Sequence, residues 1–244
     1  METSHPRRGG GRGPRTTALA RAAALALAAG VPVAALAWLV RAEHDGLTGW
    51  DARVVDSATT FARERPGLPR ALVVWQETTQ PVWLVLGVTL VALVVWRRYR
   101  LPGRAAWAVA TVLVVWGLGV ALKSAVGRAR PVVQEALEHA PGYSFPSGHA
   151  VNSSAALTVL LLLLRPVLTR RALGAVAVVG GLVVALTAAD RVLLGVHYPS
   201  DVAAGLLVGT AASLASYAGW SGAAGREARR TGAVGTGAAR TGAR

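Results

Sequence analysis

The 244-residue sequence contains no cysteine, so disulfide bonds, thiolate metal sites and cysteine nucleophiles are all excluded. Charged residues are also scarce, at 16% of the chain, whereas 53% of the residues are hydrophobic. A chain of this length with so little charge is too apolar for an ordinary soluble domain. No internal repeat divides the sequence, and its length suits one domain of moderate size.

Acidic residues are few, at 12 against 26 basic ones, and the formal net charge is +14. Lysine is almost absent, because every basic residue except Lys123 is an arginine. A strongly basic balance fits a nucleic-acid partner in general. The positions of the charges along the chain therefore have to show whether they bind nucleic acid or serve another role.

Six segments free of Asp, Glu, Lys and Arg are candidates to cross a bilayer, which takes about 20 apolar residues of helix. They are residues 22–40, 78–96, 105–122, 149–164, 172–189 and 202–220. The sequence therefore predicts an all-α integral membrane bundle of six transmembrane helices over residues 22–220. The first segment also resembles a signal peptide, with Ala35-Leu36-Ala37 as a cleavage site, but its apolar run is long for one and we predict a retained helix.

Six spans place both chain ends on the same side of the membrane. The segments on that side are residues 1–21, 97–104, 165–171 and 226–244. They hold 17 arginines and two acidic residues, whereas the other side holds nine basic and ten acidic residues. The positive-inside rule thus predicts cytoplasmic termini and accounts for the net charge without nucleic acid. We predict disordered basic cytoplasmic tails at 1–21 and 221–244, and a first outer loop at 42–70.

Three segments on the predicted outer side carry polar residues next to spans. They are Lys123-Ser-Ala-Val-Gly-Arg128-Ala-Arg130-Pro131, Tyr143-Ser-Phe-Pro146-Ser147-Gly148-His149 and Asp190-Arg191-Val-Leu-Leu-Gly-Val-His197-Tyr-Pro-Ser-Asp201. All three segments fall on the same side of the membrane. This agreement is independent evidence, because the topology was derived from the spans and from arginines elsewhere in the chain. We therefore expect the three segments to form one site.

The first of these segments supplies cations on the side where the positive-inside rule disfavours them. Lys123, Arg128 and Arg130 follow directly after an apolar span. Contact with lipid head groups explains them equally well when they are taken alone. A guanidinium suits bidentate binding of phosphate, and a lysine supplies a compact point charge.

The other two segments supply a helix start and a pair of histidines. Ser147 and Gly148 fall at a predicted helix N-terminus, where free N–H groups favour anions, although Ser147 alone is also a common N-cap. Asp201 follows His197 by four residues, and an acid beside a histidine holds one ring nitrogen as N–H and leaves the other free to attack. Asp201 alone suits any helix N-terminus. Together with His149, the set indicates an anion site with a nucleophile and an acid.

At these residues the sequence resembles the type 2 phosphatidic acid phosphatase family, which shares a core with the vanadium haloperoxidases. The family pattern is Lys-x6-Arg-Pro, Pro-Ser-Gly-His and Ser-Arg-x5-His-x3-Asp, and ten of its eleven defined positions match. The departure is Asp190, where the pattern has serine. We expect Asp190 at the C-terminal end of the fifth span, with Arg191, Lys123 or Arg128 as its cationic partner, and in a role that tunes substrate charge.

The resemblance implies a phosphohistidine mechanism. His197 would attack phosphorus, Asp201 would orient His197, and His149 would protonate the leaving group. The phosphate oxygens would be held by Lys123, Arg130, Ser147, Gly148 and Arg191. Arg128 lies outside the pattern and is expected as a contact at the rim. The resemblance implies neither a metal nor a cofactor.

The implied function is metal-independent hydrolysis of a lipid phosphate or pyrophosphate, such as phosphatidic acid or a polyprenyl pyrophosphate, at the outer face of the cell membrane. The expected partners are the lipid substrate and membrane lipids, without nucleic acid. One alternative is a phosphatase of a water-soluble phosphate ester, with the spans as a scaffold. Another is an anion or lipid transporter, which the position of the charges at the span ends disfavours.

Overall fold

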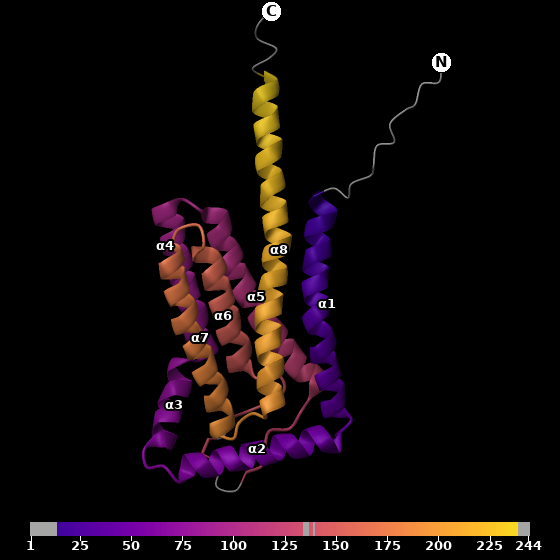
Figure 1. The fold of residues 1–244 in the computed structure, drawn as a ribbon, viewed down its shortest axis with the longest axis vertical. Coiled ribbons are helices and arrows are strands. Elements are labelled where there is room, and N and C mark those ends of the chain that lie inside the picture. The colour runs from indigo at the N-terminus through magenta and orange to yellow at the C-terminus, as the bar shows by residue number, and fades with distance from the viewer. Residues whose placement is uncertain (1–13, 134–136, 139, 239–244) are drawn as a thin grey trace, which may run out of the picture.

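The protein is a bundle of long helices in a computed structural model that describes residues 14–133, 137–138 and 140–238. Over these residues the elements are α1 (Pro14–Arg41), α2 (Asp45–Arg63), α3 (Leu68–Thr78), α4 (Pro81–Tyr99), α5 (Pro102–Val126), α6 (Gly148–Leu164), α7 (Arg170–Leu193) and α8 (Pro199–Ala238), with no strand. Figure 1 shows both chain ends at one end of the bundle and α2 lying across the other end. The predicted all-α bundle is confirmed.

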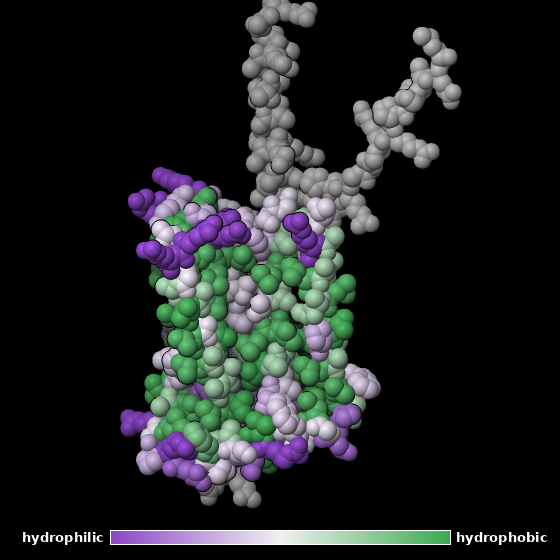
Figure 2. Space-filling model, viewed as in Figure 1, coloured by the Kyte–Doolittle hydropathy of each residue, from purple (hydrophilic) through white to green (hydrophobic). Residues whose placement is uncertain are grey.

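Five of the described helices are long and apolar enough to cross a membrane, by length and composition. They are α1, α4, α5, α7 and α8. The sixth, α6, has 17 residues and lies at the centre of the bundle, where it packs against α4, α5, α7 and α8. The six predicted spans therefore correspond to five long helices and one shorter one. Figure 2 shows a hydrophobic band around the middle of the bundle, bounded by hydrophilic residues at both ends.

Small residues allow α8 to pack closely against the central helix α6. A Cβ atom added at Gly209 would lie 2.2 Å from the Val151 carbonyl oxygen, and one added at Gly205 would lie 2.7 Å from the Ser147 carbonyl oxygen. Glycine is therefore needed at both positions for this backbone approach. The close contact holds the start of α6 against the start of α8, and both starts carry predicted site residues.

Proline and glycine set several of the helix boundaries. Pro81, Pro102 and Pro199 begin α4, α5 and α8, where the missing N–H and the fixed φ of proline are tolerated. Gly127 ends α5 in the left-handed conformation, with φ of 67°, which glycine adopts without steric penalty. The chain leaves α5 at this glycine and enters the loop that carries Arg128 and Arg130.

The segment predicted as an outer loop, 42–70, is mostly helical. The α2 helix places Asp51, Val55, Thr59 and Ala62 on one buried face, at the spacing of an amphipathic helix. Its polar face is too charged to be recognised in a search for membrane spans. The helix lies on the end of the bundle and contacts α1, α3, α7 and α8.

The chain ends are more helical than predicted in the part that the structure describes. The α1 helix begins at Pro14, inside the tail predicted at 1–21, and α8 continues to Ala238, inside the tail predicted at 221–244. Alanine and arginine are common in both stretches, and both are good helix formers. The tails predicted for 1–13 and 239–244 lie outside the described residues.

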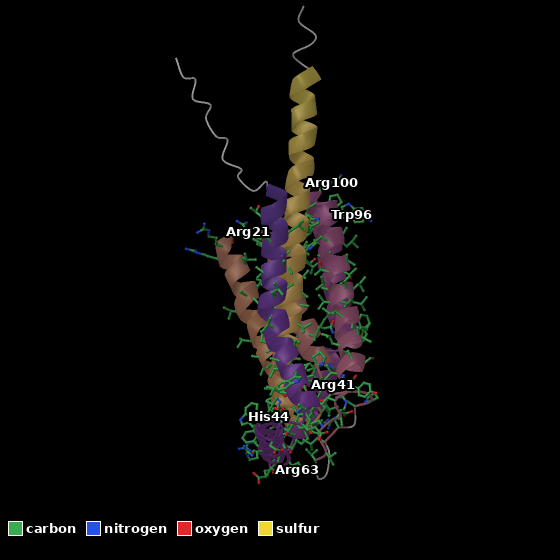
Figure 3. All side chains as sticks on the ribbon, turned by 90° about the vertical axis from the view of Figure 1, so that its right-hand side faces the viewer. Arg21, Arg41, His44, Arg63, Trp96 and Arg100 are labelled. Atoms are coloured by element: carbon green, nitrogen blue, oxygen red, sulfur yellow. The ribbon has the colours of Figure 1, made fainter. Side chains whose placement is uncertain are left out.

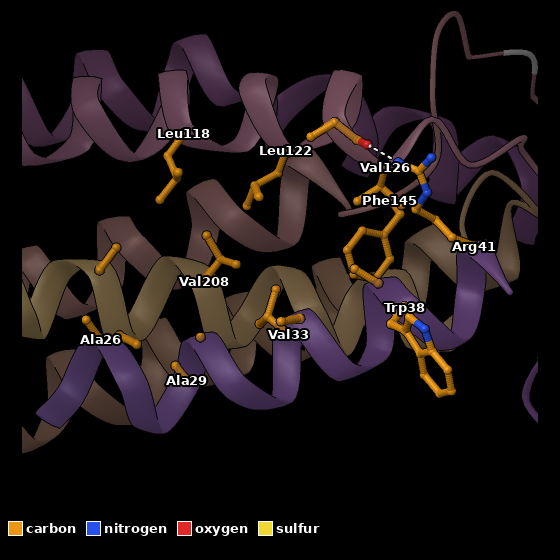
Figure 4. A pocket seen from close by; sticks show the side chains of 16 residues that line it. Ala26, Ala29, Val33, Trp38, Arg41, Leu118, Leu122, Val126, Phe145 and Val208 are labelled. Carbon is orange, nitrogen blue, oxygen red and sulfur yellow. Dashed lines mark hydrogen bonds between the residues drawn. The ribbon is translucent and has the colours of Figure 1, made fainter. Parts of the chain in front are cut away.

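An apolar groove of about 580 Å³ opens between α1, α5 and α8 (Figure 4). Its walls include Val33, Leu118, Val208 and Phe145. Arg41 lies at one end of the groove, where Nη1 donates a hydrogen bond of 2.8 Å to the carbonyl oxygen of Ala125. Figure 3 places Arg41, His44 and Arg63 at the α2 end of the bundle, and Arg21 and Arg100 at the opposite end.

Candidate active site

The three predicted segments meet at the α2 end of the bundle. Lys123 lies in the last turn of α5, and Arg130 lies in the loop that follows. Ser147 is the N-cap of α6, and His149 lies in its first turn. The third segment places Arg191 in the last turn of α7, His197 in the α7–α8 loop and Asp201 in the first turn of α8.

The ring of His197 is buried and contacts polar groups through both of its nitrogens. Nε2 lies 3.3 Å from Nη1 of Arg130, and Nδ1 lies 3.3 Å from Oγ of Ser144 and 3.6 Å from Oδ2 of Asp201. A guanidinium only donates hydrogen bonds, so the contact with Arg130 requires Nε2 to carry a lone pair. The proton therefore lies on Nδ1, on the side of Ser144 and Asp201.

Ser144 connects His197 to Asp201 and is a site residue that the sequence analysis did not assign. Its hydroxyl donates its only proton to Oδ2 of Asp201, so its oxygen accepts from Nδ1–H of His197. Asp201 is fixed further by the backbone N–H of Tyr198, which donates to Oδ2 over 2.9 Å. The serine lies three residues before Ser147, and this position in a motif loop was the only sequence signal for it.

Burial controls the protonation of His197. Its side chain is almost fully enclosed, and this lowers the pKa of His197 to about 4. Asp201 opposes the fall in this pKa, whereas the charges of Lys123 and Arg130 add to it. The imidazole is therefore neutral at pH 7, and its Nε2 lone pair faces Arg130.

Two predicted phosphate-binding cations are held by backbone carbonyl groups. Nζ of Lys123 donates to the carbonyl oxygen of Tyr143 over 2.7 Å, and Arg130 donates to those of Val196 over 2.7 Å, Pro141 over 3.0 Å and Gly142 over 3.1 Å. A side chain added at Gly148 would meet Cε of Lys123 at 3.7 Å, so Lys123 runs past the start of α6. The loop backbone thus fixes both cations before any ligand binds.

The third predicted cation, Arg191, is buried in a separate set of contacts. Nε donates to Oδ2 of Asp190 over 2.9 Å, and Nη1 donates to the side-chain oxygen of Gln76 over 2.7 Å. The expected cationic partner of Asp190 is therefore Arg191. Gln76 comes from α3, and nothing in its local sequence pointed to the site.

Three buried side-chain atoms have no hydrogen-bond partner in the part of the chain that the structure describes. They are Oγ of Ser147, Nε2 of His149 and Oδ1 of Asp190. Buried polar atoms are rarely left unpaired, because their desolvation is then uncompensated. All three belong to the predicted motif segments, and Ser147 and His149 adjoin the free N–H groups at the start of α6. Ser147 and His149 thus leave hydrogen-bonding capacity for an anionic ligand with a leaving group.

Arg128 corrects the prediction of a contact at the rim. Its side chain is only 8% exposed, and its guanidinium bridges Asp201 and Asp51 over 2.6 and 2.8 Å. The same group stacks on the ring of Tyr198 at 3.9 Å. The sequence did not show this because Asp51 lies on α2, in the segment predicted as a loop.

Within the described ranges, no group of three or more His, Asp or Glu side chains is arranged to hold a metal ion. The acids nearest to His197 are engaged by protein donors instead. Asp201 accepts hydrogen bonds from Arg128, Ser144 and Tyr198. The residues that face the proposed ligand are cations and neutral donors, which fits the binding of an anion.

Comparison with known proteins relates the chain to membrane phosphatases. Residues 104–223 match the PAP2 superfamily. The chain is 33% identical over 113 residues to phosphatidylglycerophosphatase B of Bacillus subtilis. This alignment covers 43% of this chain and 55% of that protein. It is 35% identical over 132 residues to a decaprenylphosphoryl-5-phosphoribose phosphatase of Mycobacterium tuberculosis. This alignment covers 52% of this chain and 65% of that protein.

A solved structure has the same fold. It is a transmembrane PAP2-type phosphatidylglycerolphosphate phosphatase from Bacillus subtilis, with a TM-score of 0.61 and 23% identity over 76% of this chain and 92% of that one. With its apolar helices, the chain is a multi-pass membrane protein that belongs to the PAP2 superfamily. The chain spans 55% and 65% of the length of the curated relatives it matches.

Proposed function

We propose that the protein is a membrane phosphatase that hydrolyses a lipid phosphate or pyrophosphate with His197 as the nucleophile. The observation that carries the proposal is the orientation of the His197 ring. Nδ1 faces Ser144 and Asp201, and the Nε2 lone pair points at the cationic Arg130. A phosphoryl group bound by Arg130 would lie in front of this lone pair, which is the geometry that nucleophilic attack needs.

The proposed reaction has two steps. In the first, Nε2 of His197 forms a bond to phosphorus, the bond from phosphorus to the leaving oxygen breaks, and His149, in its protonated form, gives that oxygen a proton. In the second, water attacks phosphorus, the N–P bond breaks, and His149 takes the proton from the water. Lys123, Arg130 and Arg191 would stabilise the charge on the non-bridging oxygens in both steps.

A lipid substrate is favoured by the surroundings of the site. The site lies at one end of an apolar bundle, and the groove between α1, α5 and α8 offers about 580 Å³ for hydrocarbon. Phe145 lines this groove, and its neighbour Ser144 contacts His197. The similar proteins named above are phosphatases of phosphatidylglycerophosphate and of a decaprenyl-linked phosphoribose, both lipid phosphates.

We also propose that the site faces outward from the cytoplasm. The site and both chain ends lie at opposite ends of the bundle (Figure 1), and the arginine-rich segments lie at the end that holds the termini. Val132 is 99% exposed beside the site and Arg98 is exposed at the opposite end. An impermeant thiol reagent should label a Val132→Cys variant on intact cells, and an Arg98→Cys variant only after lysis. The reverse pattern contradicts the orientation.

Phosphate release from purified protein in detergent tests the proposed function. The substrates are phosphatidic acid, phosphatidylglycerophosphate, undecaprenyl pyrophosphate and a water-soluble phosphate ester. We expect faster turnover of a lipid than of the soluble ester, inhibition by vanadate, and full activity in EDTA. Preference for the soluble ester supports a phosphatase of water-soluble substrates, in which the spans serve only as a scaffold. Transport into liposomes without hydrolysis supports a transporter. Activity lost in EDTA and restored by Mg²⁺ demands a metal mechanism.

A further inference from the structure

Asp51 is a fully buried carboxylate on α2, outside residues 104–223 that match the PAP2 superfamily. Its Oδ2 accepts from Nη2 of Arg128 over 2.8 Å and from the hydroxyl of Ser200. Its Oδ1 accepts from the backbone N–H of Ser200 over 3.1 Å. Burial of a charged group is unfavourable unless it is paired, and here every contact of Asp51 leads toward the proposed active site.

Arg128 divides its guanidinium between Asp51 and Asp201. Nη2 bonds Asp51, while Nη1 bonds Oδ1 of Asp201 over 2.6 Å and the hydroxyl of Ser200 over 2.7 Å. The side chains of both acids are fully buried and that of Arg128 is 8% exposed, so the charges interact with little screening. The buried charges thus alternate from Asp51 through Arg128 to Asp201, which adjoins His197.

We propose that Asp51 is a positioning residue that offsets the charge of Arg128, so that the buried group beside His197 keeps a net negative charge. This role rests on the function proposed above. With Asp51, the three charges sum to one negative charge, and without it they cancel. His197 gains positive charge as Nε2 bonds to phosphorus, and a negative Asp201 stabilises that charge through Ser144 and Nδ1–H. The α2 helix is thereby part of the catalytic unit.

A purely structural role makes different predictions. If Asp51 only fastens α2 to the start of α8, its loss loosens the site, raises KM and lowers the thermal midpoint. The electrostatic role predicts that Asp51→Asn, which keeps the shape of the side chain, lowers kcat by about 10- to 100-fold, as the loss of a group that orients a metal ligand does. Because the site becomes more positive, KM for an anionic lipid should not rise.

A second variant separates the two roles through charge balance. Asp51→Asn combined with Arg128→Gln removes one charge of each sign, and glutamine at 128 can still donate to Asp201. The electrostatic role predicts a higher kcat for the double variant than for Asp51→Asn alone. The structural role predicts a lower one, because two buried contacts are then altered. Asp56→Asn on the exposed face of α2 is the matched control, with kcat equal to that of wild type.

The experiment measures kcat and KM of the full chain in detergent, on whichever of phosphatidic acid and phosphatidylglycerophosphate the wild type hydrolyses faster. Reduced kcat without a raised KM in Asp51→Asn, with recovery in the double variant, supports the proposal. Wild-type kcat in Asp51→Asn, or a double variant slower than the single one, overturns it while leaving the phosphatase function intact. A wild type that releases no phosphate from any tested substrate contradicts the function and this role together.

Discussion

Asp190 and Arg191 are adjacent in the chain, and their side chains form an ion pair that is almost fully buried at the end of α7. Arg191 is one of the cations expected to bind phosphate, and Asp190 stands where the family pattern has serine. The ion pair means that Asp190 offsets part of the positive charge of the site. Asp190 is only 1% exposed, so its carboxylate does not lie in solvent at the surface of a loop.

Replacing Asp190 by serine should change the response of the enzyme to substrate charge. Asp190→Ser removes one negative charge beside Arg191, so binding of a pyrophosphate lipid should strengthen more than binding of a monophosphate lipid. We expect KM for the pyrophosphate to fall several-fold, with a smaller effect at high salt. The measurement is KM for a matched pair of mono- and pyrophosphate lipids at two salt concentrations.

Asp190→Asn is the control for this prediction, because it removes the charge and keeps the shape. Both variants should shift the ratio of the two KM values in the same direction. The same ratio as in wild type in both variants would show that Asp190 does not tune substrate charge. Complete loss of activity in a folded variant would place Asp190 in the catalytic machinery. Thermal unfolding in detergent reports whether Arg191 tolerates the loss of its partner.

Ser144→Ala should slow the reaction without preventing substrate binding. The variant removes the hydroxyl between His197 and Asp201, and one such hydrogen bond contributes about 1 kcal/mol, which corresponds to roughly a fivefold fall in kcat. KM should change little, because Ser144 does not face the proposed phosphate. Ser213→Ala on α8 removes a buried serine hydroxyl away from the site and serves as the control. An unchanged kcat in Ser144→Ala would contradict a link between the two residues.

The pH dependence of activity should reflect the lowered pKa of His197. Protonation removes the Nε2 lone pair, so kcat/KM should fall as the pH decreases through about 4, rather than through 6.5 where a free histidine titrates. The lowered pKa of His197 also affects folding. Between pH 6.5 and about 4 the unfolded chain binds a proton at His197 more readily than the folded protein does, so the folded state becomes less stable as the pH falls. A rate profile from pH 3 to 8 tests this, and a midpoint for this limb near 6.5 would contradict a buried nucleophile.

The sequence predicted the bundle and the motif residues because both leave strong local signals. Charge-free runs identified all six of these helices, including the shorter α6. The three motif segments were expected on one side, and in the structure His197, Asp201 and Arg130 are in direct contact. Local pattern and spacing were sufficient here because each segment adjoins the end of a span.

The contacts from α2 and α3 were not predictable from the sequence. Asp51 and Gln76 lie in short amphipathic helices whose ordinary polar pattern does not distinguish a site residue from a surface residue. Their roles depend on how α2 and α3 fold back over the end of the bundle, where they meet Arg128 and Arg191. That placement follows from tertiary packing, which periodicity in one segment does not encode.

A covalent phosphoenzyme is the most direct test of the central claim. Protein incubated with a lipid whose phosphate carries a radioactive label is quenched in alkaline denaturant, which preserves phosphohistidine, and the labelled peptide is identified. We predict label on His197 in the wild type. We predict no label in a folded His197→Ala variant, whose turnover falls by roughly 10³-fold or more. Label on another residue, or turnover at the wild-type rate in His197→Ala, would contradict the assignment of His197 as the nucleophile.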